Sequence, residues 1–308
     1  MRAGSPANWF GRGQKACTRC LLAAALVSGG AALAAEIGIA DGNGGSVSLK
    51  QPAQRIISLA PNITELLFAA GAGERVVGAV EYSNYPEAAQ RIARIGDSAQ
   101  LDLERIIALK PDLIVVWRSG NAQRHLEKLL QLGIPVFYSD ARRLSDIARG
   151  IEQLGHLAGT QTVALRTART FMEREAELRR RFAGRAQVTV FYQIWDKPLM
   201  TVNADHLISD VIRLCGGKNI FADLKPLAPV IAAEEVLAAD PEAIGGMAAE
   251  VGQAGNLDSW KSWPRLKAVA RGNLFVIHSD LISRDTPRIL EGAREMCEQL
   301  DAARARRK

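Results

Sequence analysis

Residues 55–71 read RIISLAPNITELLFAAG. The apolar run at 56–60 is typical of a strand that is buried on both faces of a parallel sheet. We expect Asn62 to cap the helix that follows, with Glu65 in its third position, and Gly71 to end it. A buried strand that leads directly into a helix is the building unit of an α/β fold.

The alternation of strand and helix continues to about residue 140. Apolar runs predict strands at 76–80, 113–117 and 136–138. Helical periodicity separates them over 103–110 and 121–132. We therefore expect residues 55–143 to form an N-terminal α/β lobe with a mainly parallel sheet.

The pattern changes to helix alone over residues 144–184. The periodicity is uninterrupted except near 155–160, and residues 166–181 are rich in Arg and Glu. So charged a helix is unsuited to a buried crossover, and we interpret its charges as a solvated face. We expect this region to be a rigid bridge across the outside of two lobes.

Alternation resumes in a C-terminal lobe, residues 185–303. Strands are predicted at 188–192 and 274–278, and helices at 206–214, 234–239 and 287–303. Three segments of this lobe match segments of the first in the same order. Residues 104–114 match 234–244, residues 65–71 match 210–216, and residues 136–140 match 276–280. This repetition indicates two lobes of similar construction.

Ligands of open parallel sheets bind beside the carboxyl ends of the strands. Two such lobes joined by one rigid helix present the carboxyl ends of their strands to each other. The sequence therefore predicts an α/β fold of two Rossmann-like lobes with mainly parallel sheets, joined by one long α-helix, with a ligand cleft between the lobes.

The first 35 residues read as a secretory signal peptide. They carry four basic side chains and no acidic one, and an apolar run rich in Ala and Gly leads to a cleavage site after Ala34 or Ala35. A lipoprotein anchor is the competing interpretation, but neither Cys17 nor Cys20 follows an apolar stretch. We expect a soluble, exported protein.

The positive charge of the 308-residue chain lies at its ends. The net charge of +6 falls to +2 without residues 1–35, and to −2 without the tail 304–308, which we expect to dangle. The chain therefore gives no evidence of a nucleic-acid partner, which needs a basic face on the folded body. We interpret residues 36–54 as a flexible lead-in, in which 47–49 favour a short edge strand.

Two cysteines remain after the signal peptide, Cys215 and Cys297. An even pair in an oxidising compartment favours a disulfide, and a loop of this length is worth about 4 kcal/mol in the chain-entropy model. Two buried free thiols are the alternative.

Motifs of catalysis are absent from the sequence. There is no Gly-x-Ser-x-Gly and no His-Glu-x-x-His, and residues 216–219 lack the spacing and hydroxyl of a phosphate loop. The histidines, which we interpret as packing or surface residues, lack the paired spacing of a metal site. They are His125, His156, His206 and His278. We expect a protein that is not an enzyme and that has no cofactor and no metal.

Five stretches resemble the periplasmic cobalamin-binding components of bacterial ABC importers. They are residues 55–71, 82–86, 103–121, 211–221 and 279–289. The resemblance implies a monomeric periplasmic protein that captures cobalamin (vitamin B12) or a related corrinoid and delivers it to a membrane permease. The parent group includes siderophore- and haem-binding proteins of similar fold, so a ferric siderophore or haem is the alternative ligand. An exported enzyme on a two-lobe scaffold is a second alternative.

The resemblance implies ligand contacts at Tyr82, Trp117, Asp280 and Arg284, with Trp195 near an aromatic contact. A corrinoid is a large, stiff macrocycle edged with methyl and amide groups, and it needs flat apolar surface with a few donors and acceptors. The alternatives are core packing for each Trp and a surface ion pair between Asp280 and Arg284.

The sequence departs from the family at two positions. Ser98 and Ala228 stand where the family has further tryptophans beside its pocket. Their loss implies weaker cobalamin binding, a relocated aromatic residue such as Trp195, or a different tetrapyrrole-like or chelate ligand.

Glu104 and Glu234 hold equivalent places in the internal repeat, in the first turn of a helix in each lobe. An acid there favours the helix dipole by about 0.3–1 kcal/mol. The resemblance implies a second role, docking on arginines of the dimeric permease. It also places the family's disulfide at Cys215 and Cys297.

Overall fold

A computed structural model describes residues 37–41, 44–97, 100–121, 123–248 and 257–307, with the backbone alone at 123–126. These residues all belong to one compact unit, 35–308. The predicted signal peptide and Ser98 lie outside the described residues.

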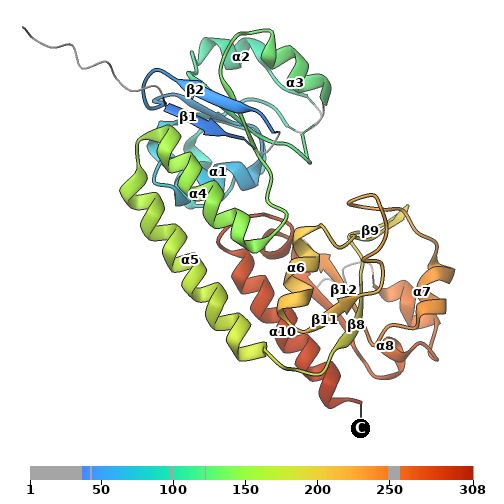
Figure 1. Cartoon of the computed structure of the whole chain (residues 1–308). Helices are drawn as coiled ribbons and strands as arrows, with labels where there is room; N and C mark the ends of the chain where they lie inside the picture. The colour runs from blue at the N-terminus through green and yellow to red at the C-terminus, as the bar shows by residue number, and fades with distance from the viewer. Residues whose placement is uncertain (1–36, 42–43, 98–99, 122, 249–256, 308) are drawn as a thin grey trace, which may run out of the picture. The chain divides into compact units, whose positions relative to one another are not determined.

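The N-terminal lobe, drawn in blue to green in Figure 1, is built on a parallel sheet. The strand order of this sheet is β5-β4-β3-β6-β7. Its strands are β3 (Ile56–Ser58), β4 (Val76–Ala79), β5 (Ala93–Arg94), β6 (Leu113–Trp117) and β7 (Val136–Ser139). Its helices are α1 (Pro61–Ala69), α2 (Leu103–Ala108) and α3 (Gln123–Leu130). All three residues of β3 are buried, as the apolar run predicts.

The C-terminal lobe has a parallel sheet with the order β11-β8-β12-β13. Its strands are β8 (Val188–Tyr192), β11 (Gly217–Asn219), β12 (Ala243–Ala248) and β13 (Leu274–His278), with a small hairpin of β9 (Trp195–Asp196) and β10 (Leu199–Met200). Its helices are α6 (Leu207–Leu214), α7 (Ala233–Ala239), α8 (Lys267–Ala270), α9 (Ser279–Ile282) and α10 (Ile289–Ala305). Short 3-10 helices lie at Gly73–Arg75, Glu87–Arg91 and Asp258–Ser262.

The two sheets repeat one topology. The order β4-β3-β6-β7 in the first lobe corresponds to β11-β8-β12-β13 in the second. Lys110 and Asp240, which the sequence repeat aligns, both have left-handed backbones with φ of 47° and 44°. The prediction of two α/β lobes of similar construction is therefore confirmed.

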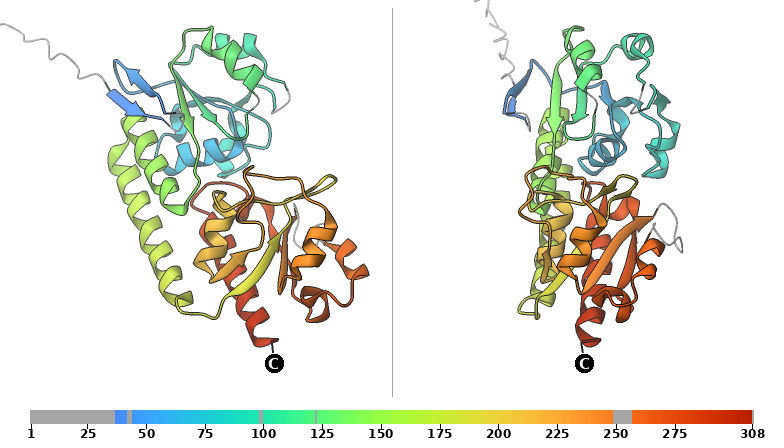
Figure 2. Two further views of the ribbon diagram at one scale, coloured as in Figure 1. Left: turned by 45° about the vertical axis from the view of Figure 1, so that its right-hand side comes forward. Right: turned by 90° about the vertical axis from the view of Figure 1, so that its right-hand side faces the viewer.

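The bridge consists of two helices, α4 (Leu144–Ala158) and α5 (Gln161–Phe182). They pack side by side (Figure 2). Gly159 separates them with φ of 67°, a left-handed helix end that glycine adopts without strain. Along α5 only Ala164, Ala168, Phe171 and Phe182 are buried, so its Arg and Glu side chains form a solvated face.

The hydrophobic core explains how the lobes are held. One cluster of buried residues is continuous from Ile56 and Leu113 in the first lobe, through α4 and α5, to Val188 and Met296 in the second. Two further clusters are confined to one lobe each. The lobes therefore share packing on the bridge side, where α10 also contacts α5 and α6.

Three local expectations differ from the structure. Asn62 is not a helix cap, because the N-cap of α1 is Ala60 and the Asn62 side chain is buried against Asp285. The lead-in, which we interpreted as flexible, forms an antiparallel hairpin of β1 (Ile37–Ala40) and β2 (Ser46–Leu49). The strand predicted at 47–49 is confirmed as part of β2.

The tail does not dangle either. Arg304 donates to the carbonyl oxygen of Cys215 at 2.7 Å, and Arg307 forms an ion pair of 2.7 Å with Glu242. These contacts fix the end of the chain to the second lobe, so part of its positive charge is neutralised.

Candidate functional site

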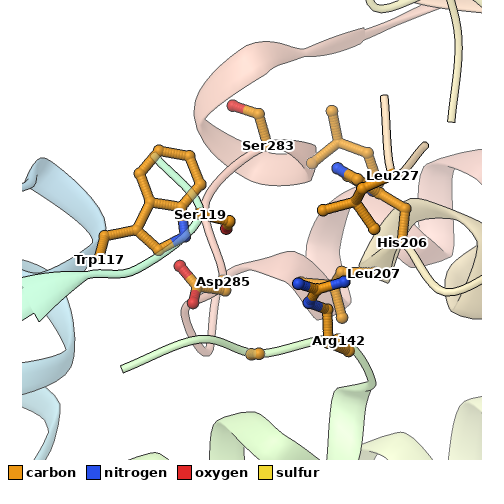
Figure 3. Close-up of a pocket in the computed structure, with 10 residues that line it drawn as sticks. Trp117, Ser119, Arg142, His206, Leu207, Leu227, Ser283 and Asp285 are labelled. Atoms are coloured by element: carbon orange, nitrogen blue, oxygen red, sulfur yellow. The ribbon is translucent and has the colours of Figure 1, made fainter. Parts of the chain in front are cut away.

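The carboxyl ends of the strands in both lobes meet at a small pocket with a cavity volume of about 30 Å³ (Figure 3). Trp117 ends β6, residues 141–142 follow β7, and Ile282 ends the helix after β13. The pocket is lined by Trp117, Ser119, Ala141, Arg142, His206, Leu207, Leu227, Ile282, Ser283 and Asp285. The predicted cleft between the lobes therefore exists, with apolar walls and a few polar groups.

Trp117 is held by its own loop. Its backbone N–H donates to Oδ1 of Asn121 at 2.8 Å, and the Asn121 amide donates to the carbonyl oxygen of Leu59 at 2.8 Å. The indole lies against Gly120, where an added Cβ would sit 1.8 Å from Trp117 Cε3. The loop after β6 therefore needs both Asn121 and Gly120 to orient the ring.

Tyr82 and Arg284 connect the lobes at the rim of the site. Tyr82 follows β4 in the left-handed region at φ of 63°, and its side chain is 78% exposed. Arg284 donates to the Tyr82 carbonyl oxygen at 3.4 Å and to Asn84 Oδ1 at 3.0 Å. A non-glycine residue in the left-handed region carries local backbone strain, which persists only where the surrounding contacts hold it.

Asp280 pairs with Arg284 at 2.8 Å. This is not the surface pair that we considered as the alternative, because the Arg284 side chain is mostly buried and reaches the other lobe. Burial is the largest influence on the pKa of Arg284 and lowers it, against the charges of Asp280 and Glu65.

Trp195 does not line the pocket. It lies in the small hairpin of the second lobe, 59% exposed, and its indole N–H donates to the carbonyl oxygen of Lys197. Ala228 is half-buried beside Leu227, which does line the pocket. Of the proposed contact residues, the structure brings Trp117 into the pocket and Tyr82 and Arg284 together. The ligand-binding roles of all five stay predictions.

An ion-pair cluster across the lobes was not foreseen. Glu65 of α1 is 3% exposed and accepts two hydrogen bonds from Arg288, at 2.7 and 2.8 Å. Arg284 lies 3.8 Å from the same carboxylate, and the Arg288 guanidinium stacks 3.9 Å from the Tyr85 ring centre. The sequence predicts a capping role for Glu65. It gives no sign of the ion pair, because Arg288 lies 223 residues away in the chain.

Two titratable side chains of the pocket have shifted pKa values. Burial lowers the pKa of His206 to about 4, with a further contribution from Arg142. The neutral ring caps α6, since its Nδ1 accepts from the Ile208 N–H at 3.1 Å. Burial raises the pKa of Asp285 to about 7, while the hydrogen bond from Asn62 opposes the rise. Our interpretation of His206 as a packing or surface residue missed its place in the pocket.

Glu104 and Glu234 lie on α2 and α7, one in each lobe, in the first turn of the helix. Both side chains are exposed. The equivalent placement follows from the repeated topology, and the docking role of these two residues stays a prediction.

Cys215 and Cys297 form a disulfide, as predicted, which joins the end of α6 to α10 with Cα atoms 4.6 Å apart. Over the residues that the structure describes, no group of three or more His, Cys, Asp or Glu side chains could hold a metal ion. In the same part of the chain, no helix has the length and apolar character needed to cross a membrane.

Comparison with known proteins agrees with this architecture. Residues 56–281 match the family described as periplasmic binding protein. The vitamin B12-binding protein of Vibrio cholerae is 38% identical over 253 residues, which cover 82% of this chain and 91% of that protein. The vitamin B12-binding protein of Yersinia pestis is 37% identical over 251 residues, or 81% of this chain and 87% of that protein.

A solved structure agrees with these sequence matches. The crystal structure of the periplasmic vitamin B12 binding protein BtuF of Vibrio cholerae superposes with a TM-score of 0.75 at 37% identity, and the match covers 82% of this chain and 98% of that one. The prediction of a binding protein rather than an enzyme is thereby confirmed. The chain belongs to the periplasmic binding protein family.

Proposed function

We propose that this protein binds cobalamin or a related corrinoid in the periplasm and delivers it to the permease of an ABC importer. The observation that carries the proposal is the pocket between the strand ends of both lobes, with Trp117 as its flat wall. The match to proteins named for vitamin B12 binding, over more than four-fifths of the chain, supports the ligand.

The site has the chemistry that a corrinoid requires. Trp117, Leu207 and Leu227 supply apolar surface, while Ser119, Arg142 and Asp285 supply donors and acceptors for amide groups. Tyr82 and Trp195 present two further exposed rings. The pocket is small for a whole macrocycle, so we infer that it receives one edge of the ligand while exposed rings of the rim flank the rest.

The experiment is a titration of the purified protein with cyanocobalamin, followed by intrinsic tryptophan fluorescence. We expect quenching that saturates, and a weaker affinity in Trp117→Leu. Trp263→Leu is the control, because Trp263 is an exposed tryptophan that does not line the pocket. Equal loss of affinity in both variants would refute the role of Trp117.

A ferric siderophore or haem is the second candidate. The observation that favours it is the replacement of two family tryptophans by Ser98 and Ala228. Haem or a ferric siderophore that competes with bound cyanocobalamin at equal concentration would favour this candidate. We expect cyanocobalamin to remain bound in the presence of either.

For delivery, we propose that Glu104 and Glu234 contact basic side chains of the permease. One exposed carboxylate on each lobe, at equivalent positions, suits a partner with two-fold symmetry. The double variant Glu104→Ala, Glu234→Ala is expected to bind ligand normally and to lower uptake by cells. Glu173→Ala, an exposed acid of α5, is the control. Unimpaired uptake by the double variant would defeat this part of the proposal.

A further inference from the structure

Asp285 is a buried carboxyl group on the wall of the pocket. Its side chain is 4% exposed, and its Oδ1 accepts a hydrogen bond from the Asn62 amide of the other lobe. No donor among the described residues reaches Oδ2. In Figure 3 the carboxyl group lies between Trp117 and Arg142, with its oxygens on the side of Trp117.

The cations near Asp285 already have partners. Arg142 pairs with Asp140 at 2.8 Å, Arg288 pairs with Glu65, and Arg284 pairs with Asp280. An unpartnered, buried acceptor is costly unless something supplies a donor. Because the oxygen belongs to a residue that lines the pocket, a bound ligand is well placed to supply it.

We propose that Asp285 Oδ2 accepts a hydrogen bond from an N–H group of the ligand, so that the pocket selects a macrocycle edged with carboxamides over one edged with carboxylates. An amide N–H satisfies the oxygen, whereas a ligand carboxylate meets a like charge. The inference rests on the proposed function and assigns this selectivity to one residue.

The raised pKa of Asp285 agrees with this role, because burial disfavours the charged form and outweighs the hydrogen bonds that the carboxyl group receives from the Asn62 side chain and from the backbone N–H groups of Asp285 and Ala141. The charge of Asp140 adds to the rise. A ligand donor would favour the charged form. The selectivity should therefore be measured at pH 8.5, where the carboxyl group is ionised in the free protein.

The test compares cyanocobalamin with its monocarboxylic derivatives, in each of which one peripheral amide is hydrolysed. The dissociation constants are measured by calorimetry for the full chain as it is exported, and for Asp285→Asn. For the wild type we expect at least one derivative to bind about tenfold more weakly than cyanocobalamin, since one charged hydrogen bond is replaced by repulsion. For Asp285→Asn, which is neutral and of equal size, we expect that ratio to fall to within about twofold of unity.

Thr286→Val is the matched control. Thr286 is adjacent and fully buried, and its hydroxyl has no hydrogen-bond partner among the described residues, yet it does not line the pocket. This variant is expected to keep the wild-type ratio. Circular dichroism of each variant checks that it is folded, and the comparison of ligands on the wild type needs no substitution.

The outcomes separate the two claims. If the wild type binds cyanocobalamin and all its derivatives equally, or if Asp285→Asn keeps the full ratio, the role of Asp285 is overturned while the proposed function stands. If the wild type does not bind cyanocobalamin, both are overturned.

Discussion

Asp285 and His206 line one pocket and are expected to give opposite contributions to the pH dependence of folding stability. The pKa of Asp285 rises from 3.8 to about 7 on folding, so the folded protein retains a proton that the unfolded chain has lost between these values. The stabilisation of the folded protein by this retained proton is complete below pH 3.8, the pKa of the unfolded chain. It disappears as the pH rises through about 7, the pKa of Asp285 in the folded protein. At 1.36 kcal/mol per pKa unit, the loss is up to about 4 kcal/mol.

His206 acts in the other direction. Its pKa falls from 6.5 to about 4 on folding, so the unfolded chain takes up the proton first as the pH drops. Its stabilisation is complete above the unfolded pKa and is lost as the pH falls toward the folded one, with a maximum of about 3 kcal/mol. In the wild type the two effects partly cancel between about pH 4 and pH 6.5.

Two single variants make each effect visible. Asp285→Asn removes the carboxyl titration at equal size, and His206→Asn removes the imidazole titration while keeping an acceptor at the cap of α6. The free energy of unfolding is measured by urea denaturation from about pH 4 to pH 8. The excess stability of the wild type over Asp285→Asn should decrease with pH.

The excess stability of the wild type over His206→Asn, measured in the same way, should increase with pH over the same range. Two flat difference curves, or two curves of the same slope, would refute the reasoning, because they would mean that neither burial nor the neighbouring charges shift these groups as described.

Three further changes test the structure. Glu65→Gln should lower the free energy of unfolding by about 3 kcal/mol, because it removes the buried carboxylate that pairs with the half-buried Arg288. Adding Arg288→Met should recover part of the loss in urea denaturation, and a further loss would contradict the pairing. Gly120→Ala should weaken cyanocobalamin binding about tenfold by displacing Trp117. Gly38→Ala, where an added Cβ meets open space, should bind as the wild type does, and equal affinity of all three proteins would exclude a role for the ring. Replacing both disulfide cysteines with Ala should reduce stability by about 4 kcal/mol for a separation of 82 residues, and unchanged thermal unfolding would contradict the structural role of the bridge.

The sequence predicts the fold where local signals coincide with burial. The strands at 113–117, 188–192 and 274–278 have the predicted bounds, because each is a short apolar run between helical segments. The central strand β12 was not identified as a strand, since Gly245 and Gly246 weaken its strand pattern. Gly245 is explained by packing, because an added Cβ would lie 2.7 Å from both Tyr192 and Phe275.

Less of the candidate site than of the fold could be predicted from the sequence. Trp117 could be predicted because a tryptophan ends a buried strand at the edge where ligands collect. Asp285 and its partner Asn62 could not, because they lie 223 residues apart and meet only when the lobes pack together. Arg142 and His206 carry no motif either, and only the shared pocket gives them a role.

Calorimetric titration of the purified protein with cyanocobalamin tests the central claim most directly. We predict one molecule bound per chain with a nanomolar dissociation constant, equivalent to about −12.3 kcal/mol at 1 nM. The absence of heat at micromolar concentrations, together with saturable binding of haem or a ferric siderophore, would contradict it.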